Sequence, residues 1–259
     1  MILSAEQERL KAAYIRARGY WTDWTEGMLR FSPGFLDLYA RYGGYPAANG
    51  PLSPLMCELI YVALDASSTH LFGSGLRLHM ALAVKHGATP AQVMEVLAMA
   101  TEQGLGGTRL GAEILAEELV AAGQAVPELD VALSAEQEAL RDAWIARLGD
   151  WPHHADVLLR LDPGYFALVL ELSGYADPAD RLAEEDRVLI RLALDACFTG
   201  LNQAALREGI KRAIALGVEW QAILQVLQLT AHLGVHACAL GASALTTITD
   251  QAKPGPRAI

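Results

Sequence analysis

The chain contains one sequence pattern twice, at a constant offset of 130 residues. The motif LSAEQE begins at Leu3 and again at Leu133, and PG followed by an aromatic residue begins at Pro33 and again at Pro163. Roughly a third of the aligned positions are identical, which indicates a duplicated module. Where the copies agree, the scaffold needs the residue. Where a reactive residue occurs in only one copy, the scaffold does not require it.

Local signals in both copies predict helices. Ser4 and Ser134 each begin a capping-box motif, and Pro33 and Pro163 each follow a residue that can cap a helix. No segment shows the sustained alternation of a β-strand. We therefore predict an all-α fold with about six helices per module. The expected parts are a first module at 1–120, a linker at 121–132, a second, diverged module at 133–248, and a mobile tail at 249–259.

Composition limits the possible partners. Hydrophobic residues make up 53% of the chain, so apolar surface must be buried within the modules, between them, and in a homo-oligomer interface. The formal net charge of -10 argues against nucleic acid as a partner. No apolar run approaches the roughly 18 residues of a membrane helix, so no membrane partner is expected. The absence of a signal peptide and of a cysteine framework predicts a cytoplasmic protein.

Two histidines distinguish the first copy. His70 and His79 are replaced in the second copy by Gly200 and Gly209, so the scaffold tolerates their loss. Imidazole is the side chain whose unperturbed pKa suits proton transfer near neutral pH. The alternative for His79 is a buried histidine that holds two helices together.

Asp65 and Thr69 stand in the same segment as His70, and both recur in the second copy. They are therefore expected to be scaffold residues that cap a helix or orient a neighbour. Arg77 also recurs, as Arg207. It is expected either to pair with a helix end or a carboxylate, or to hold a substrate carboxylate through its two-pronged donor geometry.

The second copy has histidines of its own, His232 and His236, four residues apart and thus on one helix face with Gln225 and Gln228. This face is either solvated or lines a pocket. In the second case, the histidines of the two copies would form one shared site per chain. The spacing of His232 and His236 also suits a metal, which would need a further ligand from His70, His79 or Glu102.

The segment ELIYVALDASSTHLFGSGLRLHMALAVKHGATPAQVMEVLAMA, from Glu58 to Ala100, resembles the carboxymuconolactone decarboxylase family, which includes the alkylhydroperoxidase-D-like proteins. The resemblance implies a fold of two tandem alkylhydroperoxidase-D-like modules. It also implies a homo-oligomer, with a trimer favoured and a dimer possible. His79 matches the histidine of the decarboxylase branch, and Glu58 resembles the glutamate that opens the preceding helix.

The peroxidase branch of this family carries C-x-x-C-x-x-x-H, a thiol pair that cycles through a disulfide. Counted back from His79, the thiol positions hold Phe72 and Gly75, and in the second copy they hold Asn202 and Ala205. Neither copy can form that disulfide. The resemblance therefore implies the decarboxylase branch, which needs no cofactor and no metal.

The predicted function is that of a cofactor-free lyase acting on a small carbonyl or lactone carboxylic acid through an enolate. The alternatives are an isomerase or hydrolase on a similar substrate, a metal-dependent enzyme, and a non-catalytic helical scaffold that binds a small molecule. The expected catalytic residues are His79, His70 and Glu58. The expected substrate-binding residues are Asp65, Thr69, Arg77, Glu102, His232 and His236.

Overall fold

The computed structural model describes residues 3–252, and this part of the chain contains helices and no strand. The all-α prediction is confirmed. The helices of the first half are α1 (Ala5–Arg18), α2 (Asp23–Phe31), α3 (Pro33–Asn49), α4 (Pro54–Asp65), α5 (Gly73–Lys85), α6 (Pro90–Thr101), the 3-10 helix η1 (Glu102–Leu105) and α7 (Gly106–Ala121). After the short α8 (Pro127–Asp130) come α9 (Ala135–Leu148), α10 (His153–Leu161), α11 (Pro163–Leu172), α12 (Glu184–Ala196), α13 (Gln203–Ala215), α14 (Trp220–Thr230), η2 (Ala231–Val235) and α15 (His236–Gln251).

Each α-helix of the second half begins 130 residues after its counterpart in the first half, from α1 and α9 to α7 and α15. Ser4 and Ser134 cap α1 and α9 as their motifs predict, each accepting a hydrogen bond from the backbone N–H three residues on. The prediction of about six helices per module is one too few, because each half contains seven α-helices in the described residues, α1–α7 and α9–α15. The apolar pattern runs on past α6 and past α14, but a 3-10 turn ends each of these helices, so a separate helix follows.

Two expected irregular segments are partly helical. The predicted linker at 121–132 contains α8, which packs against α10. The predicted tail begins inside α15, since that helix continues to Gln251. Its remaining residues, 253–259, lie outside the described part of the chain.

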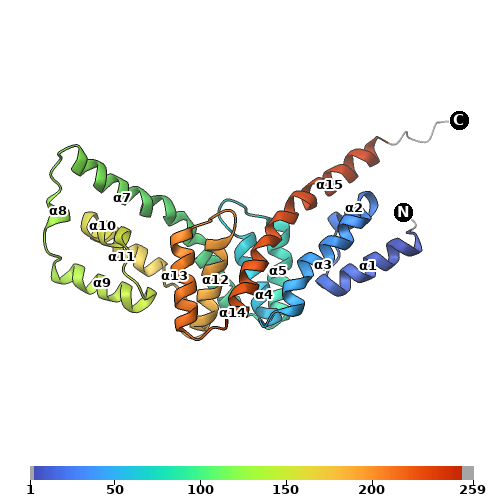
Figure 1. The fold of residues 1–259 in the computed structure, drawn as a ribbon, viewed down its shortest axis with the longest axis horizontal. Helices are drawn as coiled ribbons and strands as arrows, with labels where there is room; N and C mark the ends of the chain where they lie inside the picture. The colour runs from blue at the N-terminus through green and yellow to red at the C-terminus, as the bar shows by residue number, and fades with distance from the viewer. Residues whose placement is uncertain (1–2, 253–259) are drawn as a thin grey trace.

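A central bundle of α4, α5, α6, α12, α13 and α14 forms the middle of the molecule (Figure 1). Its largest apolar cluster joins the two halves, because α4 packs against both α12 and α14, and α6 packs against α12. Fully buried Ile60, Leu64, Ile190 and Leu192 are part of this core. The Glu58–His79 region lies on two of the three first-half helices of this bundle, α4 and α5.

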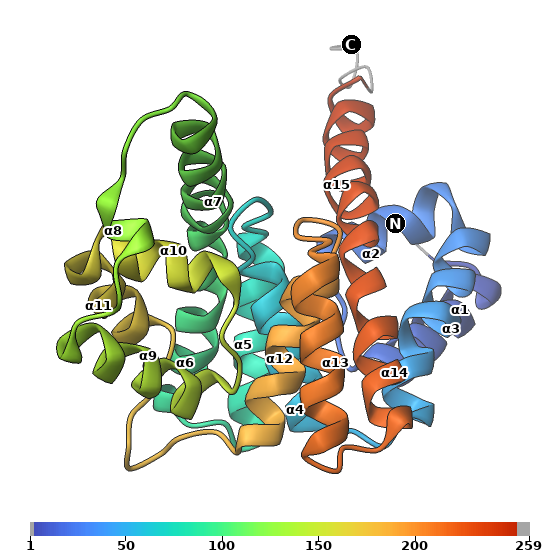
Figure 2. The same cartoon turned by 60° about the vertical axis from the view of Figure 1, so that its left-hand side comes forward.

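The last helix of each half packs against the other half. α15 lies along α2, and α7 lies along α10, so two flanking groups of helices stand on either side of the bundle (Figure 2). In one group, Val235 packs with Tyr14 and Leu29; in the other, Leu105 packs with Trp144. The predicted module boundaries therefore do not separate two packing units, and residues near 232–236 are placed against the first half.

Within the described residues, one stretch is long and apolar enough to cross a membrane by length and composition alone, Trp220–Gln251. Half of its most apolar window is buried inside the protein, where α14 contacts α3, α4 and α12 and α15 contacts α2. This packing is typical of a core helix, although the sequence analysis expected no apolar run of this length.

Docking of α15 depends on a close approach at Gly27. A Cβ atom at Gly27 would lie 2.9 Å from the Ala242 carbonyl oxygen and 2.9 Å from Thr246 Oγ1, whereas one at Gly34 would meet nothing within 4 Å. We expect Gly27→Ala to lower the free energy of unfolding by about 1–3 kcal/mol, because the backbone of α15 must move. The matched variant Gly34→Ala should be neutral or stabilising. Urea unfolding curves measure both; equal stability of the two variants would contradict the docking.

Candidate functional site

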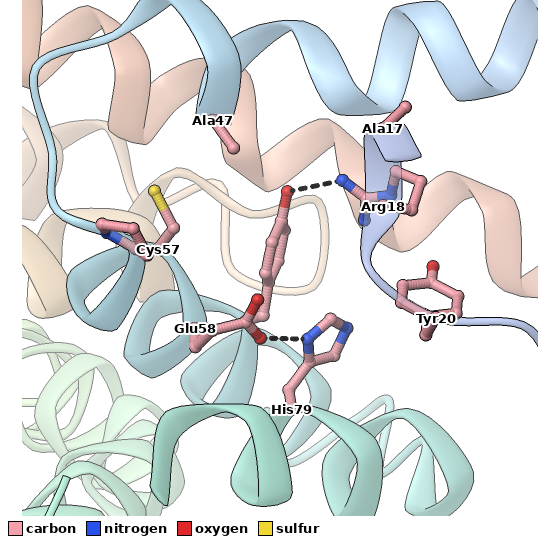
Figure 3. Close-up of a pocket in the computed structure, with 9 residues that line it drawn as sticks. Ala17, Arg18, Tyr20, Ala47, Cys57, Glu58 and His79 are labelled. Carbon is pink, nitrogen blue, oxygen red and sulfur yellow. Dashed lines mark hydrogen bonds and ion pairs between the residues drawn. The ribbon is translucent and has the colours of Figure 1, made fainter. Parts of the chain in front are cut away.

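A cavity of about 90 Å³ lies where the end of α1 and the helix α3 meet α4 and α5. It contains the Glu58–His79 pair, with Arg18 and Tyr20 on the neighbouring N-terminal segment (Figure 3). The lining residues are Ala17, Arg18, Tyr20, Ala47, Pro54, Cys57, Glu58, Tyr61 and His79. A cavity of this size, with polar groups converging on one end, fits a small polar ligand.

Glu58 and His79 form a hydrogen-bonded pair. His79 Nδ1 lies 2.7 Å from Glu58 Oε2, and the side chain of His79 is 2% exposed. The Glu58 carboxylate accepts a hydrogen bond from Nδ1–H, which leaves Nε2 as the ring nitrogen available for proton transfer to a ligand. The ring of Tyr61 packs 4.6 Å from the His79 ring, measured between centroids. The pair can therefore act as an oriented acid and base.

Arg18 supplies positive charge to the same cavity. Gly19, which follows it with φ 76°, ends α1 in a left-handed turn and directs Arg18 and Tyr20 to the pocket. The Arg18 guanidinium donates to the Gly43 carbonyl at 2.6 Å and to the Tyr61 hydroxyl at 3.4 Å. Its Nε is buried and has no hydrogen-bond partner among the described residues. Arg18 thus retains a donor for a ligand oxygen.

His232 reaches this region from η2 in the other half of the chain. Its Nδ1 lies 2.9 Å from the Tyr39 hydroxyl and 3.4 Å from the Arg18 guanidinium, and its ring lies 5.3 Å from that of His79. Burial, and then the charge of Arg18, lowers the pKa of His232 well below its usual value. His232 is therefore neutral, and Tyr39 donates to its Nδ1.

The solvated-face alternative for the second-half histidines is wrong, because His232 and His236 are both buried. The predicted stripe with Gln225 and Gln228 is also wrong in part, because α14 ends before His232 and Gln228 is exposed. Gln225 is buried, but it donates to the Pro46 carbonyl and so serves as a structural contact.

His70, His236 and Asp65 form a second group beside the first. His70 Nε2 lies 2.5 Å from His236 Nδ1, and His236 Nε2 lies 3.5 Å from Asp65 Oδ1. Asp65 is fully buried, and burial, together with the charge of Glu58, raises the pKa of its carboxyl to about 8. The rings of His232 and His236 lie 5.1 Å apart. The structure therefore brings His70, His79, His232 and His236 together.

Three of the predicted substrate-binding residues lie elsewhere. Thr69 is exposed in the turn between α4 and α5. Arg77 is exposed on α5, because two residues of helix place it about 200° from His79. Glu102 sits at the position equivalent to His232 in the other half, where it accepts a hydrogen bond from Arg191 at 2.7 Å.

The equivalent region of the other half holds a different set of side chains. Val188 stands in place of Glu58 and Arg191 in place of Tyr61, and Arg191 pairs with Glu102. Burial raises the pKa of Glu102 to about 7 and that of Asp195 to about 6, against the opposing charges of Arg109 and Arg191. An ionic network replaces the histidines, and no acid–base pair like Glu58–His79 is present there in the described residues.

The reasoning from sequence missed three pocket residues, Arg18, Tyr20 and Tyr61, and also Tyr39, which contacts His232. A signal for them existed. The second copy replaces them with Leu148, Asp150, Arg191 and Val169, the same one-copy pattern that identified His70 and His79. Occurrence in only one copy therefore marks tyrosine and arginine residues of the site as well as histidines.

The thiol in the pocket is unreactive. Burial, and then the charge of Glu58, raises the pKa of Cys57 to about 11, so it stays protonated at neutral pH. At the two thiol positions of the peroxidase branch, Phe72 stacks on His236 and Gly75 lies against the Asp65 carboxylate. The region is thus built without a redox pair.

Asp195 gives a pH-dependent prediction. Its raised pKa means that the folded protein holds a proton between about pH 4 and pH 6 that the unfolded chain has lost. The stability contributed by this carboxyl therefore falls as the pH rises through that window. We expect the free energy of unfolding of the wild type, relative to Asp195→Asn, to fall by about 2–3 kcal/mol from pH 4 to pH 7. Urea unfolding at several pH values measures this, and parallel curves would contradict it.

Comparison with known proteins gives a family match over part of the first half of the chain. A family model described as the Carboxymuconolactone decarboxylase family matches residues 33–118, which include Glu58, Asp65, His70 and His79. The chain finds no match among curated protein sequences.

Among solved structures, the chain is similar to a Burkholderia xenovorans LB400 protein that bears the name gamma-carboxymuconolactone decarboxylase subunit as a proposed assignment. The two are 25% identical, and the match covers 95% of this chain and 98% of that chain with a TM-score of 0.89. At the level of the family, the implied function is decarboxylase-like. Residues 33–118 thus match the model of the carboxymuconolactone decarboxylase family, and the overall fold is similar to that of the Burkholderia xenovorans LB400 protein.

Proposed function

We propose that the protein is a lyase that removes a carboxyl group from a small carbonyl or lactone carboxylic acid without a cofactor. The observation that carries the proposal is the Glu58–His79 pair in a small cavity that also holds the Arg18 guanidinium. Decarboxylation next to a carbonyl needs a donor for the enolate oxygen and an acid for the carbon, and these residues supply both.

In the proposed reaction, the bond between the α-carbon and the carboxylate breaks and CO2 leaves. The electron pair of that bond moves toward the carbonyl oxygen as an enolate. Arg18 is assigned to this oxygen, because a cation there stabilises charge that develops during the reaction. A cation on the departing carboxylate would instead stabilise the starting state. Arg18 thus takes the role that the sequence alone gave to His70 or His232.

His79 then protonates the carbon. Its imidazolium form donates the Nε2 proton to the α-carbon, the electron pair of the enolate forms the new C–H bond, and neutral imidazole remains. Solvent returns the proton to Nε2. The Glu58 carboxylate accepts the Nδ1 hydrogen bond throughout, which holds the ring in place.

The competing proposal is an isomerase that shares the enolate. It is favoured by the same Nε2 atom, which can remove a proton from carbon as a base before returning one elsewhere. Incubation in deuterated solvent separates the two, since an isomerase incorporates deuterium without releasing CO2.

We predict that His79→Ala lowers CO2 release from a panel of β-keto and γ-lactone acids by about 10²–10⁴-fold, because the proton donor is lost. Glu58→Gln should retain part of the activity, and the exposed histidine variant His86→Ala should retain all of it. Product analysis and circular dichroism of each variant provide the measurement. Equal turnover in His79→Ala and the wild type would refute the role of His79.

We also propose that the chain forms a homo-oligomer through the projecting helices α7 and α15. Leu110 and Val120 on α7 are 61% and 67% exposed, and Leu240 and Ile248 on α15 are 66% and 61% exposed. Several large apolar side chains exposed on one helix often mark a surface that packs against another subunit. Light scattering should give about three times the chain mass of 27.8 kDa. A monomer at micromolar concentration would contradict the proposal.

A further inference from the structure

We propose that Asp65, His70 and His236 bind one divalent transition-metal ion, at a site beside the pocket. Each of the three offers one ligand atom, and these atoms all lie within 4.8 Å of one another. Ligand atoms around a single first-row ion lie about 3–4 Å apart, since metal–ligand bonds are about 2.1 Å long. Small side-chain rotations therefore bring the three atoms to bonding distance.

The Asp65 carboxylate points to a bound cation. Asp65 has no exposed surface, and both of its carboxylate oxygens lack a hydrogen-bond partner among the described residues. A buried carboxyl group whose two oxygens both lack a hydrogen-bond partner is rare, because burying a polar atom without a partner costs free energy. The nearest polar atom of the cluster is His236 Nε2, at 3.5 Å.

The other half of the chain shows what the scaffold does without such a site. Asp195 occupies the equivalent position, and there the positive charges of Arg109 and Arg191 act on the carboxylate. The positions equivalent to His70 and His236 hold Gly200 and Gly106. Arginine charges compensate Asp195, whereas two imidazoles, those of His70 and His236, lie near Asp65. In a metal site, imidazoles and a carboxylate are held together by the ion that they all bind.

The surrounding residues hold the cluster in place. The Phe72 ring stacks on His236 at a centroid distance of 3.8 Å and an interplanar angle of 15°, which fixes the imidazole plane. Gly75 leaves room for the Asp65 carboxylate, because a Cβ atom there would overlap its Oδ2. Leu71, with φ 44°, shapes the turn that presents His70. Leu201 has nearly the same φ, so the turn belongs to the scaffold and the histidine is the addition.

The donor set defines the class of ion. Two imidazole nitrogens and one carboxylate oxygen suit zinc, iron, cobalt or nickel in the divalent state, whereas magnesium and calcium prefer oxygen ligands alone. His70 is only half-buried, which leaves a side open for a water ligand. His232 separates the site from His79, with ring distances of 5.1 Å to His236 and 5.3 Å to His79. None of the three proposed metal ligands therefore belongs to the Glu58–His79 pair.

The full chain, stripped with a chelator and dialysed, tests the proposal by calorimetric titration with Zn²⁺ and by the visible absorption of added Co²⁺. We expect one ion per chain and the ligand-field bands of Co²⁺ bound to nitrogen and oxygen. Asp65→Asn and His70→Gln should each weaken binding at least tenfold. The matched variants Asp195→Asn and His86→Gln should bind like the wild type.

The metal-free thermal midpoint shows whether each variant is folded. His70→Gln changes a half-buried side chain, so a folded variant is available even where Asp65→Asn is unstable. Failure of the wild type to bind Zn²⁺ or Co²⁺ at micromolar concentration would overturn the proposal. So would equal binding by the wild type and a folded His70→Gln variant.

Discussion

The exchange of terminal helices between the two halves is the constraint on which the rest of the structure depends. Because α15 packs along α2, and η2 packs against α4 as well as α14, the histidines of η2 and α15 come close to residues of the first half. His232 therefore reaches Tyr39, 193 residues earlier in the chain, and His236 reaches His70, 166 residues earlier. Neither half alone contains the complete set of histidines.

Comparison of the two halves distinguishes the residues that both halves share from the residues that occur at the site in one half only. Both halves retain the aspartate at the end of the same helix, Asp65 in α4 and Asp195 in α12, and both retain the left-handed leucine in the following turn. Around these shared elements, one half places tyrosines, histidines and Arg18, and the other places an arginine–carboxylate network. A single chain thus carries one acid–base site, and the second position has become an ionic contact.

Much of the fold could be predicted from the sequence, because helix ends are local. Ser4 and Ser134 begin helices where their capping boxes predict, and the offset between the halves holds for every α-helix. The exchange of α7 and α15 could not be predicted, because hydrophobic periodicity says which face is buried and not which helix covers it.

The site could be predicted only in part, because some of its residues come together through contacts between distant parts of the chain. His79 was identified because the second copy lacks it and because it matches the family's histidine, and Glu58 was identified from the same resemblance. Arg77 was assigned to the wrong face by its nearness in sequence, although helix geometry alone places it away from His79. The burial of His232 depends on contacts with residues far away in the chain, such as Tyr39. The sequence pattern around His232 therefore left open whether its helix face is solvated or lines a pocket. Arg18 was missed because it stands outside the segment that carries the family resemblance.

The central claim is that one working site per chain is built from both halves. The most direct test compares turnover in two variants at equivalent positions, His232→Asn in η2 and Glu102→Gln in η1, on a substrate that the wild type decarboxylates. The account predicts a large loss of kcat in His232→Asn and wild-type turnover in Glu102→Gln. Unchanged turnover in a folded His232→Asn variant, or equal losses in both, would contradict it.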